Sequence, residues 1–200
     1  MEHYYTKNTT TQSNKKDIIY YIKDKELKFT SDNGVFSKSG IDFGSNLLIT
    51  TFLDKVKDEK KSLLDVGCGY GVMGLTINYF KPLLNITMVD INERAISLTK
   101  ENSKSLNLSA NIFYSDALSN VEGTFDYIIT NPPIRTGKTV IYKIYEESYN
   151  HLNDKGELYI VIQKKQGAQS TQAKLIELFG NCETINKKSG YQILRCIKNK

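Results

Sequence analysis

The residues of this chain with the clearest chemical potential are a run of alternating glycines between two acids. Gly67, Gly69 and Gly71 follow Asp65, and Asp90 comes 19 residues after the last of them. Glycine lets a loop turn sharply and lets backbone approach a ligand that a side chain would keep away. A carboxylate at position 90 can accept both hydroxyls of a ribose. The spacing predicts a nucleoside-type ligand, and the acid that opens the loop suits a cationic group better than a pyrophosphate.

A second candidate is the segment Asn131-Pro132-Pro133-Ile134, which directly follows an apolar run at 125–130. Proline lacks a backbone N–H and fixes φ, so a strand must end here and Asn131 is pushed toward extended geometry. An amino group on a base or an amide is a poor nucleophile because its lone pair is delocalised. The Asn131 side-chain oxygen and the Pro132 carbonyl can accept its two hydrogens and hold the nitrogen about 3 to 3.5 Å from an electrophile. This predicts transfer to an amino group without an obligatory general base.

The elements that must position these residues alternate between strand and helix. Strands are expected at 62–66, 86–90, 112–114, 125–130, 158–162, 183–186 and 192–197. Helices are expected at 45–56, with Ser45 as the cap, and at 71–80, 92–106 and 170–179. A further helix is expected along the apolar stripe formed by Ile141, Ile144, Tyr145 and Leu152. The pattern predicts an α/β, Rossmann-like, doubly wound and mostly parallel sheet. The last two strands are too close for a crossover, so the C-terminal strand should be antiparallel. Ligands bind beyond the carboxyl ends of such strands, which brings the glycine loop and Asn131 together.

The N-terminal region reads as an elaboration of this core. Residues 1–16 have no core-forming pattern and are expected to be a mobile tail. A strand from Ile18, a turn from Lys23 to Glu26 and a strand from Leu27 to Thr30 predict a small β-hairpin. With 200 residues in all, the expected organisation is one domain at 17–200, with a hairpin or lid at 17–44 and a core at 45–200.

Composition excludes several classes of protein. Hydrophobic residues at 40% and charged residues at 24% are ordinary globular values. The apolar runs fall well short of about 18 residues, so no membrane span is expected, and without a secretory signal the expected location is the cytoplasm. Two histidines and three widely spaced cysteines offer little material for a metal site, and none is expected.

Positive charge is concentrated in the last third of the chain. Residues 135–200 carry 12 basic and 6 acidic side chains, whereas residues 1–134 carry 15 and 16. Such an asymmetry can attract a polyanion, although a solvated lysine face is an equally good interpretation. Because Arg135, Lys138, Lys164 and Lys165 follow predicted strands at their carboxyl ends, they are the candidate RNA-binding residues.

These motifs resemble those of a known family. The run Asp65-Val66-Gly67-Cys68-Gly69-Tyr70-Gly71 resembles motif I of class I S-adenosylmethionine-dependent methyltransferases. Together with the Asn-Pro-Pro segment, the runs 34–37 and 42–45 are similar to the RsmC type, which methylates a guanine exocyclic amine in small-subunit ribosomal RNA. The resemblance implies S-adenosyl-L-methionine as cofactor and ribosomal RNA, or the small ribosomal subunit, as partner.

The resemblance also implies roles for individual residues. The cofactor-binding set is Phe36, Asp42, Asp65, Gly67, Cys68, Gly69, Gly71, Asp90, Ile91, Asp116, Ala117 and Asn131, and the catalytic set is Asn131, Pro132, Pro133 and Ile134. Phe36 is equally well interpreted as a core aromatic, and Asp42 as the acid that starts a helix. Cys68 is interpreted as a small filler rather than a nucleophile, because no histidine or lysine adjoins it.

Two departures from the family pattern leave alternatives open. Ile134 stands where the family usually has an aromatic residue that stacks on the target base. The additional N-terminal half of the two-domain members is not seen in this sequence. Methylation of a glutamine amide in a protein, or a cofactor-binding module without catalysis, therefore remain as alternatives. The sequence does not give the methylated nucleotide or the oligomeric state.

Overall fold

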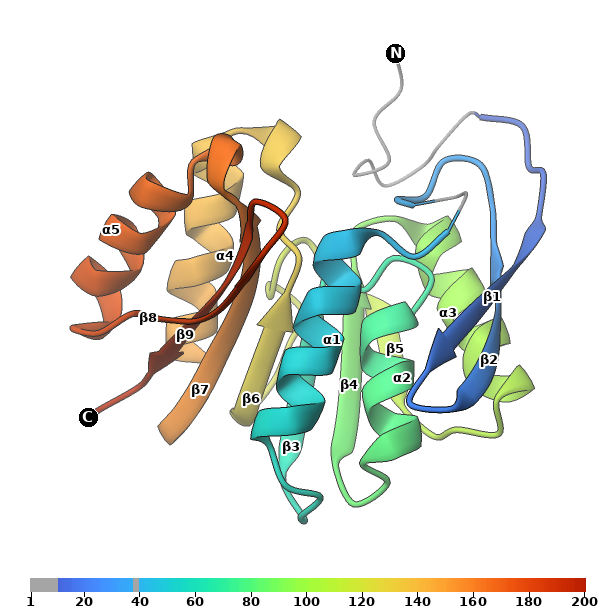
Figure 1. The fold of residues 1–200 in the computed structure, drawn as a ribbon, viewed down its shortest axis with the longest axis horizontal. Coiled ribbons are helices and arrows are strands. Elements are labelled where there is room, and N and C mark those ends of the chain that lie inside the picture. Colours follow the sequence, from blue (N-terminus) through green and yellow to red (C-terminus); the bar gives the residue numbers. More distant parts are fainter. Residues whose placement is uncertain (1–10, 38–39) are drawn as a thin grey trace.

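A computed structural model describes residues 11–37 and 40–200 (Figure 1). Its main sheet has seven strands in the order β5-β4-β3-β6-β7-β9-β8. The strands are β3 (Ser62–Val66), β4 (Asn85–Asp90), β5 (Asn111–Tyr114), β6 (Phe125–Thr130), β7 (Leu152–Gln163), β8 (Glu183–Lys188) and β9 (Tyr191–Ile197). All neighbours pair in parallel except that β9 is antiparallel to both β7 and β8. The predicted α/β, doubly wound sheet with an antiparallel C-terminal strand is confirmed.

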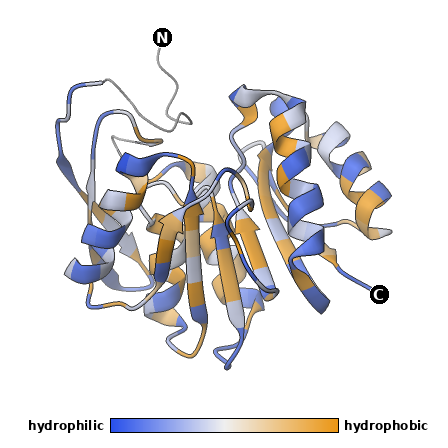
Figure 2. Ribbon diagram, turned by 180° about the vertical axis from the view of Figure 1, so that it is seen from behind, coloured by the Kyte–Doolittle hydropathy of each residue, from blue (hydrophilic) through white to orange (hydrophobic). Residues whose placement is uncertain are grey.

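Helices cover both faces of this sheet. The buried side chains of α1 (Phe43–Lys55), α2 (Val72–Phe80) and α3 (Glu93–Ser105) join one core, and those of α4 (Lys138–Asn150) and α5 (Ala168–Phe179) join the other. Strand residues alternate between these cores, so Leu63 belongs to the first and Leu64 to the second. Figure 2 shows the resulting band of hydrophobic strands between the helices. None of the helices in the described ranges is long and apolar enough to cross a membrane.

The predicted N-terminal hairpin is present but tighter than expected. It consists of β1 (Lys16–Ile22) and β2 (Lys25–Ser31), joined by Lys23 and Asp24 at φ values of 46° and 61°. Positive φ at both central residues is the geometry of a two-residue hairpin turn, which matches the twist of the strands. The predicted turn from Lys23 to Glu26 was therefore too long, because Lys25 and Glu26 already belong to the second strand.

The chain after the hairpin is fastened to the start of α3. Asp32 is buried and accepts hydrogen bonds from Ser13 Oγ at 2.7 Å and from the Asn14 amide at 2.5 Å. Arg94 Nη1 donates to the Asn33 carbonyl at 2.7 Å. The first two bonds join the segments that flank the hairpin, and the bond from Arg94 holds the segment before residue 35 against the start of α3. Residues 1–10 of the predicted tail lie outside the described residues.

Two local predictions were wrong for identifiable reasons. Helix α1 is capped by Asp42, not Ser45, because the Asp42 carboxylate accepts the amides of Gly44 and Ser45 and so places Ser45 inside the first turn. Leu152, expected on a helical stripe, begins β7 instead and pairs with Phe125. Helix α4 ends at Asn150, so the helical spacing of apolar residues that predicted this helix does not extend to Leu152.

Candidate active site

A cavity of about 910 Å³ opens at the carboxyl edge of the sheet. Most of the residues selected from the sequence line it: Phe36, Asp42, Gly67, Cys68, Gly69, Asp90, Ile91, Asp116, Ala117, Asn131, Pro132, Pro133, Ile134 and Arg135. Asp65, Gly71, Lys138, Lys164 and Lys165 are not among the lining residues. The expectation that the glycine loop and the Asn-Pro-Pro segment meet at one edge of the sheet is therefore fulfilled.

The glycine loop lines one side of the cavity through residues 67–69. Gly67, Gly69 and Gly71 have φ values of 74°, 59° and 93°, a region that other residues rarely adopt. A Cβ added to Gly67 or Gly69 would meet no protein atom within 4 Å, whereas one on Gly71 would lie 2.9 Å from both Leu75 and Thr99. The first two glycines thus keep open the space that a ligand would take. Gly71 is required for packing between α2 and α3.

Asp90 ends β4 beside this loop. Its Oδ2 accepts the Gly69 amide at 2.8 Å, and its Oδ1 accepts the Asn92 amide at 2.8 Å. Burial raises the pKa of this carboxyl above its ordinary value. Each oxygen keeps a further lone pair, so the side chain both fixes the loop and can accept two hydroxyl groups from a ligand in the cavity.

The loop after β5 closes the cavity next to Asp90. Asp116 lines it and forms an ion pair with Lys143 of α4 at 3.3 Å. Ala117 has a φ of 50°, a conformation that costs a residue with a Cβ roughly 1 to 2 kcal/mol. The next amide, that of Leu118, donates to Glu147 Oε2 at 2.8 Å. Helix α4 therefore holds this strained turn in place at the cavity wall.

Asp65 lies behind the glycine loop, not in the cavity wall. The side chain is fully buried, and its Oδ2 accepts the Gly74 amide of α2 at 2.9 Å. No described residue is a hydrogen-bond partner of Oδ1. Burial, with a smaller contribution from the Asp90 charge, raises the pKa of Asp65 to about 7. Asp65 was predicted to bind the cofactor; its side chain turns toward the start of α2 and does not line the cavity.

We expect Asp65 to make the ligand-free protein less stable as pH rises. The pKa of Asp65 lies at about 7 in the folded protein against 3.8 ordinarily, so the folded state holds a proton that the unfolded state has lost between these values. The free energy of unfolding then falls with pH across this window and is level above it. Asp65→Asn removes this titrating group. The free energy of unfolding of Asp65→Asn, relative to that of wild type, should therefore rise by up to about 1.4 kcal/mol per pH unit within this window.

Urea denaturation of both proteins at about pH 5 and about pH 8 measures this difference. Asp58→Asn provides a control at an exposed aspartate whose side chain caps the Leu83 amide far from the cavity. A stability difference between wild type and Asp65→Asn that is the same at both pH values would contradict the prediction.

Cys68 is a buried thiol within the loop. Its Sγ lies 3.7 Å from Thr99 Oγ1, and burial raises the pKa of the thiol well above its ordinary value. The nucleophilic form of cysteine is the thiolate, which this environment disfavours. The geometry therefore agrees with the interpretation of Cys68 as a small side chain that fills space.

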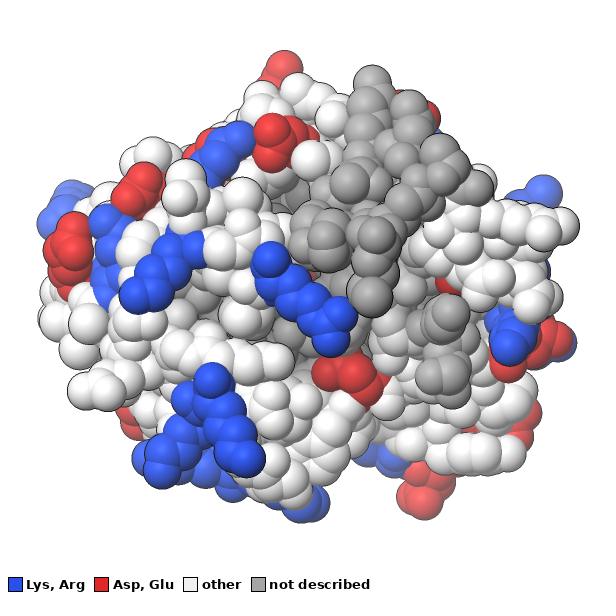
Figure 3. All heavy atoms as spheres, turned by 90° about the horizontal axis from the view of Figure 1, so that it is seen from above, with Lys and Arg blue, Asp and Glu red and all other residues white. Residues whose placement is uncertain are grey.

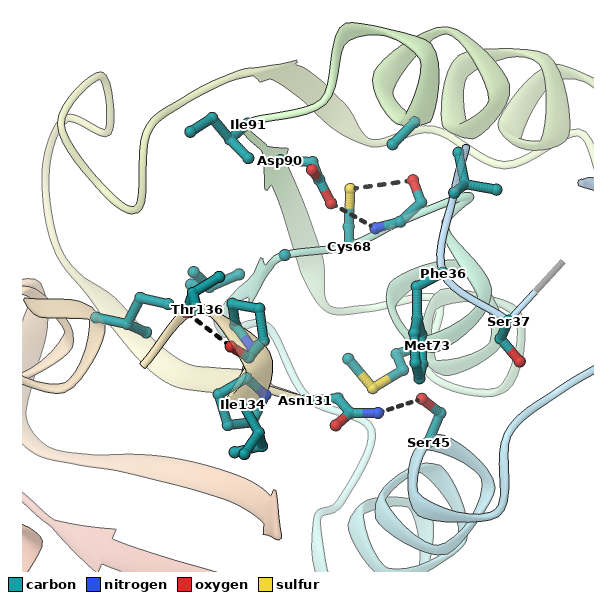
Figure 4. Close-up of a pocket in the computed structure, with 18 of the residues that line it drawn as sticks. Phe36, Ser37, Ser45, Cys68, Met73, Asp90, Ile91, Asn131, Ile134 and Thr136 are labelled. Atoms are coloured by element: carbon teal, nitrogen blue, oxygen red, sulfur yellow. Dashed lines mark hydrogen bonds between the residues drawn. The ribbon is translucent and has the colours of Figure 1, made fainter. Parts of the chain in front are cut away.

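The side-chain amide of Asn131 is fixed from one side (Figure 4). Its Nδ2 donates to Ser45 Oγ at 3.0 Å and to Asp42 Oδ2 at 3.3 Å, both at the start of α1. A carboxylate accepts hydrogen bonds and does not donate them, so the amide nitrogen must be the atom that faces Asp42. The Asn131 oxygen accepts no hydrogen bond from any residue in the described ranges. It is therefore available to accept a hydrogen from a ligand.

The two proline carbonyls have different surroundings. The Pro133 carbonyl accepts the Thr136 amide at 2.9 Å and the Thr136 hydroxyl at 2.7 Å, bonds that close the turn η1 (Ile134–Thr136). The Pro132 carbonyl has no hydrogen-bond donor among the described residues. Upstream, Thr130 Oγ1 donates to the Val66 carbonyl at 2.9 Å and fixes the end of β6 to β3. The segment is thus rigid, and it offers two acceptors, Asn131 Oδ1 and the Pro132 carbonyl.

Several cavity residues could not be selected from the sequence. Ser45, Met73, Gln166 and Tyr191 line the cavity together with the predicted residues. Ser45 belongs to the run 42–45 that pointed to the site, but it was interpreted as a helix cap. No local signal marks Tyr191, which lies 60 residues after Asn131 and joins it only because β9 inserts beside β7.

The predicted RNA-binding residues lie at or near the cavity rim. Arg135 lines the cavity, Lys138 is exposed at the start of α4, and Lys164 and Lys165 are exposed in the turn η2 (Lys164–Gln166). No described acidic residue forms an ion pair with any of the three lysines. Seen from above the carboxyl edge, Lys and Arg side chains gather on the left half, over the C-terminal part of the chain (Figure 3). The charges of Lys138, Lys164 and Lys165 are therefore not balanced by an ion pair within the described part of the chain.

Comparisons with known proteins agree with this geometry. Residues 26–195 match the family model of the methyltransferase small domain. A Bacillus subtilis protein described as the uncharacterized protein YbxB is 46% identical over 200 residues, covering 98% of both chains. The small-subunit ribosomal RNA methyltransferase C of Erwinia tasmaniensis is 32% identical over 179 residues, or 88% of this chain and 51% of its own length. This chain therefore spans about half the length of that relative.

A solved structure shares the fold. The 16S ribosomal RNA N2 G1207 methyltransferase (RsmC) of T. thermophilus, solved in complex with AdoMet and guanosine, superposes with a TM-score of 0.84. It is 23% identical, and the match covers 92% of this chain and 51% of that one. At this identity the likeness supports the Rossmann-like fold.

Proposed function

This chain belongs to the methyltransferase small domain family, and we propose that it transfers a methyl group from S-adenosylmethionine to the exocyclic amine of a base in RNA. The proposed target is guanine in small-subunit ribosomal RNA, the substrate class named for its RsmC relatives. The observation that carries the proposal is the Asn131 amide, whose nitrogen is held by Ser45 and Asp42 while its oxygen is left for an amino group.

The cavity fits this cofactor. Gly67 and Gly69 leave open the space that a Cβ would fill, and Asp90 presents two oxygens for ribose hydroxyls. Asp65 Oδ1, one layer behind the loop, has no hydrogen-bond partner among the described residues, and a cationic group bound over the loop would favour the ionised form of this carboxyl. When bound, S-adenosylmethionine supplies an electrophilic methyl carbon whose bond to sulfur breaks, with the electron pair left on sulfur, as an amine lone pair attacks.

Asn131 and Pro132 would orient the attacking amine. Asn131 Oδ1 and the Pro132 carbonyl each accept one of its two hydrogens, which aims the nitrogen lone pair away from them. Partial positive charge develops on the nitrogen as the new bond forms, and both acceptors stabilise it better than the neutral starting amine. One of the two protons then leaves to water. Orientation at about 3 to 3.5 Å would supply much of the rate, and no histidine is among the described residues that line the cavity.

Basic residues at the rim favour RNA over a protein substrate. Arg135, Lys138, Lys164 and Lys165 would meet phosphates, which position a strand without reading its sequence. A base must leave a stack to reach Asn131, so a single-stranded region is the expected target. With ribosomal RNA as the substrate, the reaction would take place in the cytoplasm. Methylation of a glutamine amide would use the same acceptor pair but has no need of four basic residues.

Calorimetry and methyl-transfer assays together test the proposal. Titration with S-adenosylmethionine should show binding to a single site. With labelled cofactor, label should enter RNA or small ribosomal subunits and not a release-factor protein. Label in the protein alone would favour the glutamine reaction, and binding without transfer to either substrate would favour a module that has no catalytic activity.

We expect Lys164→Glu with Lys165→Glu to weaken RNA binding and to flatten its dependence on salt. If each lysine meets one phosphate of a single strand, the slope of log K against log salt should fall by about 1.4 in total. Filter binding of single-stranded RNA over a range of potassium chloride concentrations measures the slope. Lys57→Glu with Lys60→Glu is a matched control, because this exposed pair precedes β3 at the opposite edge of the sheet. An unchanged slope would remove η2 from the RNA footprint.

A further inference from the structure

We propose that Tyr191, supported by Phe43, is the aromatic surface on which the target base stacks. This inference rests on the proposed function and specifies the acceptor as a planar nucleobase. Ile134, which follows the second proline, offers an apolar contact but no aromatic ring. The structure places Tyr191 of β9 in the lining of the same cavity and Phe43 of α1 against its ring.

The sheet order divides the cavity into a cofactor half and an acceptor half. The glycine loop, Asp90 and Asp116 follow β3, β4 and β5, which form one end of the sheet. Asn131 follows the next strand, β6, and Tyr191 begins β9 two strands further on. With the cofactor on the β5 side, the acceptor must enter between Asn131 and the β9 end. Tyr191 lines the cavity on this side.

Close contacts fix the Tyr191 ring beside the residues that orient Asn131. A Cβ added to Gly44 would lie 3.1 Å from Tyr191 Cε1 and 3.0 Å from Asp42 Oδ1. The ring therefore lies against the bare backbone of Gly44, next to the carboxylate that receives the Asn131 amide. Glycine at position 44 is what allows the ring and the carboxylate to come this close. Tyr191 and Asn131 thus line the same cavity, and the ring lies next to a residue that fixes the Asn131 amide.

Phe43 supports the ring from the outside. The centroids of Phe43 and Tyr191 lie 5.4 Å apart with an interplanar angle of 41°. Phe43 is 37% exposed although it begins a helix whose other apolar residues are largely buried. The Tyr191 hydroxyl has no hydrogen-bond partner among the described residues. A partly exposed aromatic pair whose hydroxyl has no described polar partner suits a base, because every base offers a π-face.

Basic residues lie in η2 and at the end of β8, next to the turn that precedes Tyr191. The Lys164 amide donates to the Gly190 carbonyl at 2.8 Å, which ties η2 to the turn just before Tyr191. Lys187 and Lys188 precede the same turn and are exposed, with no ion pair to a described residue. Phosphates held by these lysines would deliver the adjoining base to the ring. Stacking and phosphate contacts side by side are the combination used by proteins that bind single-stranded nucleic acid.

Steady-state methyl transfer to RNA by Tyr191→Leu, Tyr191→Phe and Phe43→Leu tests the inference. Tyr191→Leu should raise KM for RNA at least about tenfold, within the range expected for loss of one stacked base, with a smaller change in kcat. Tyr191→Phe keeps the ring and should stay within about twofold of wild type. Tyr21→Leu is the matched control, because Tyr21 is 73% exposed on the hairpin and outside the cavity. The dissociation constant for S-adenosylmethionine should be unchanged in all four.

Each outcome separates the inference from the proposed function. Wild-type kinetics in both Tyr191→Leu and Phe43→Leu would overturn the inference. A Tyr191→Phe protein as impaired as Tyr191→Leu would also overturn it, because the hydroxyl and not the ring would then be the group that binds RNA. If Tyr191→Leu does not fold, Phe43→Leu tests the inference in its place, because the exposed Phe43 ring supports Tyr191 from the surface. Phe43→Leu should raise KM for RNA about threefold. A wild-type protein that methylates no RNA would instead refute the proposed function.

Discussion

Asn131→Ala should reduce kcat for methyl transfer by at least about 100-fold while the dissociation constant for S-adenosylmethionine stays within a few fold. Removal of one oriented acceptor from a site of developing charge typically costs this much. The side chain lies at the junction of the two halves of the cavity, and its only described hydrogen bonds run to Asp42 and Ser45 of α1. Single-turnover kinetics at saturating cofactor and RNA measure the chemical step directly.

Asn131→Asp gives a control of nearly equal size. The aspartate keeps an acceptor oxygen but cannot donate to Asp42, and it places two carboxylates in contact where 3.3 Å now separates donor from acceptor. We expect it to be impaired as well, with cofactor binding retained. Loss of cofactor binding in Asn131→Ala would show that the residue serves the donor and not the acceptor. Wild-type turnover would remove it from the mechanism.

Asp90→Ala should weaken S-adenosylmethionine binding by about 100-fold or more. Two hydrogen bonds from ligand hydroxyls to a carboxylate would be lost, each worth about 1.5 to 3 kcal/mol. The amides of Gly69 and Asn92 would also lose their acceptor, so the glycine loop would no longer be fixed to β4. Isothermal titration calorimetry measures the loss of affinity, and a thermal melt without ligand measures the cost to the loop.

Asp90→Asn separates these two effects. The amide oxygen can still accept one backbone N–H, so the loop should be closer to wild type, whereas one acceptor for ligand hydroxyls is lost. Its affinity should fall between those of wild type and Asp90→Ala. Asp154→Ala, at an exposed site on β7 near the C-terminus, should bind the cofactor normally. An affinity within twofold of wild type in Asp90→Ala would place the ribose elsewhere.

The sequence predicted the sheet and the central site because their signals are local. Ser62–Val66 and Phe125–Thr130 are apolar runs that end abruptly, one at glycines and the other at two prolines. Steric rules fix the backbone at such ends, and the parallel topology brings them to one edge. The family model that matches residues 26–195 bears out the resemblance read from these motifs.

What the sequence could not predict depends on contacts between distant segments. Asp42 competes with Ser45 as the cap of α1, and only the path of the preceding chain decides between them. Asp65 belongs to the recognised motif, yet strand alternation turns its side chain toward Gly74 and away from the cavity. Tyr191 comes to the cavity that Asn131 lines only through the insertion of β9 between β7 and β8. The sequence allowed Asp42 as the acid that starts the helix, but local spacing neither decided between Asp42 and Ser45 nor connected Tyr191 with the site.

The most direct measurement is the chemical identity of the methylated product. RNA and small ribosomal subunits from cells that lack this protein are incubated with it and with methyl-labelled S-adenosylmethionine, then digested to nucleosides and separated. We expect label on the exocyclic nitrogen of guanosine with the wild-type protein and no such label with Asn131→Ala. Label on a ring nitrogen, a carbon atom or a ribose hydroxyl would contradict it, because none of these presents the two hydrogens that Asn131 and Pro132 are placed to accept.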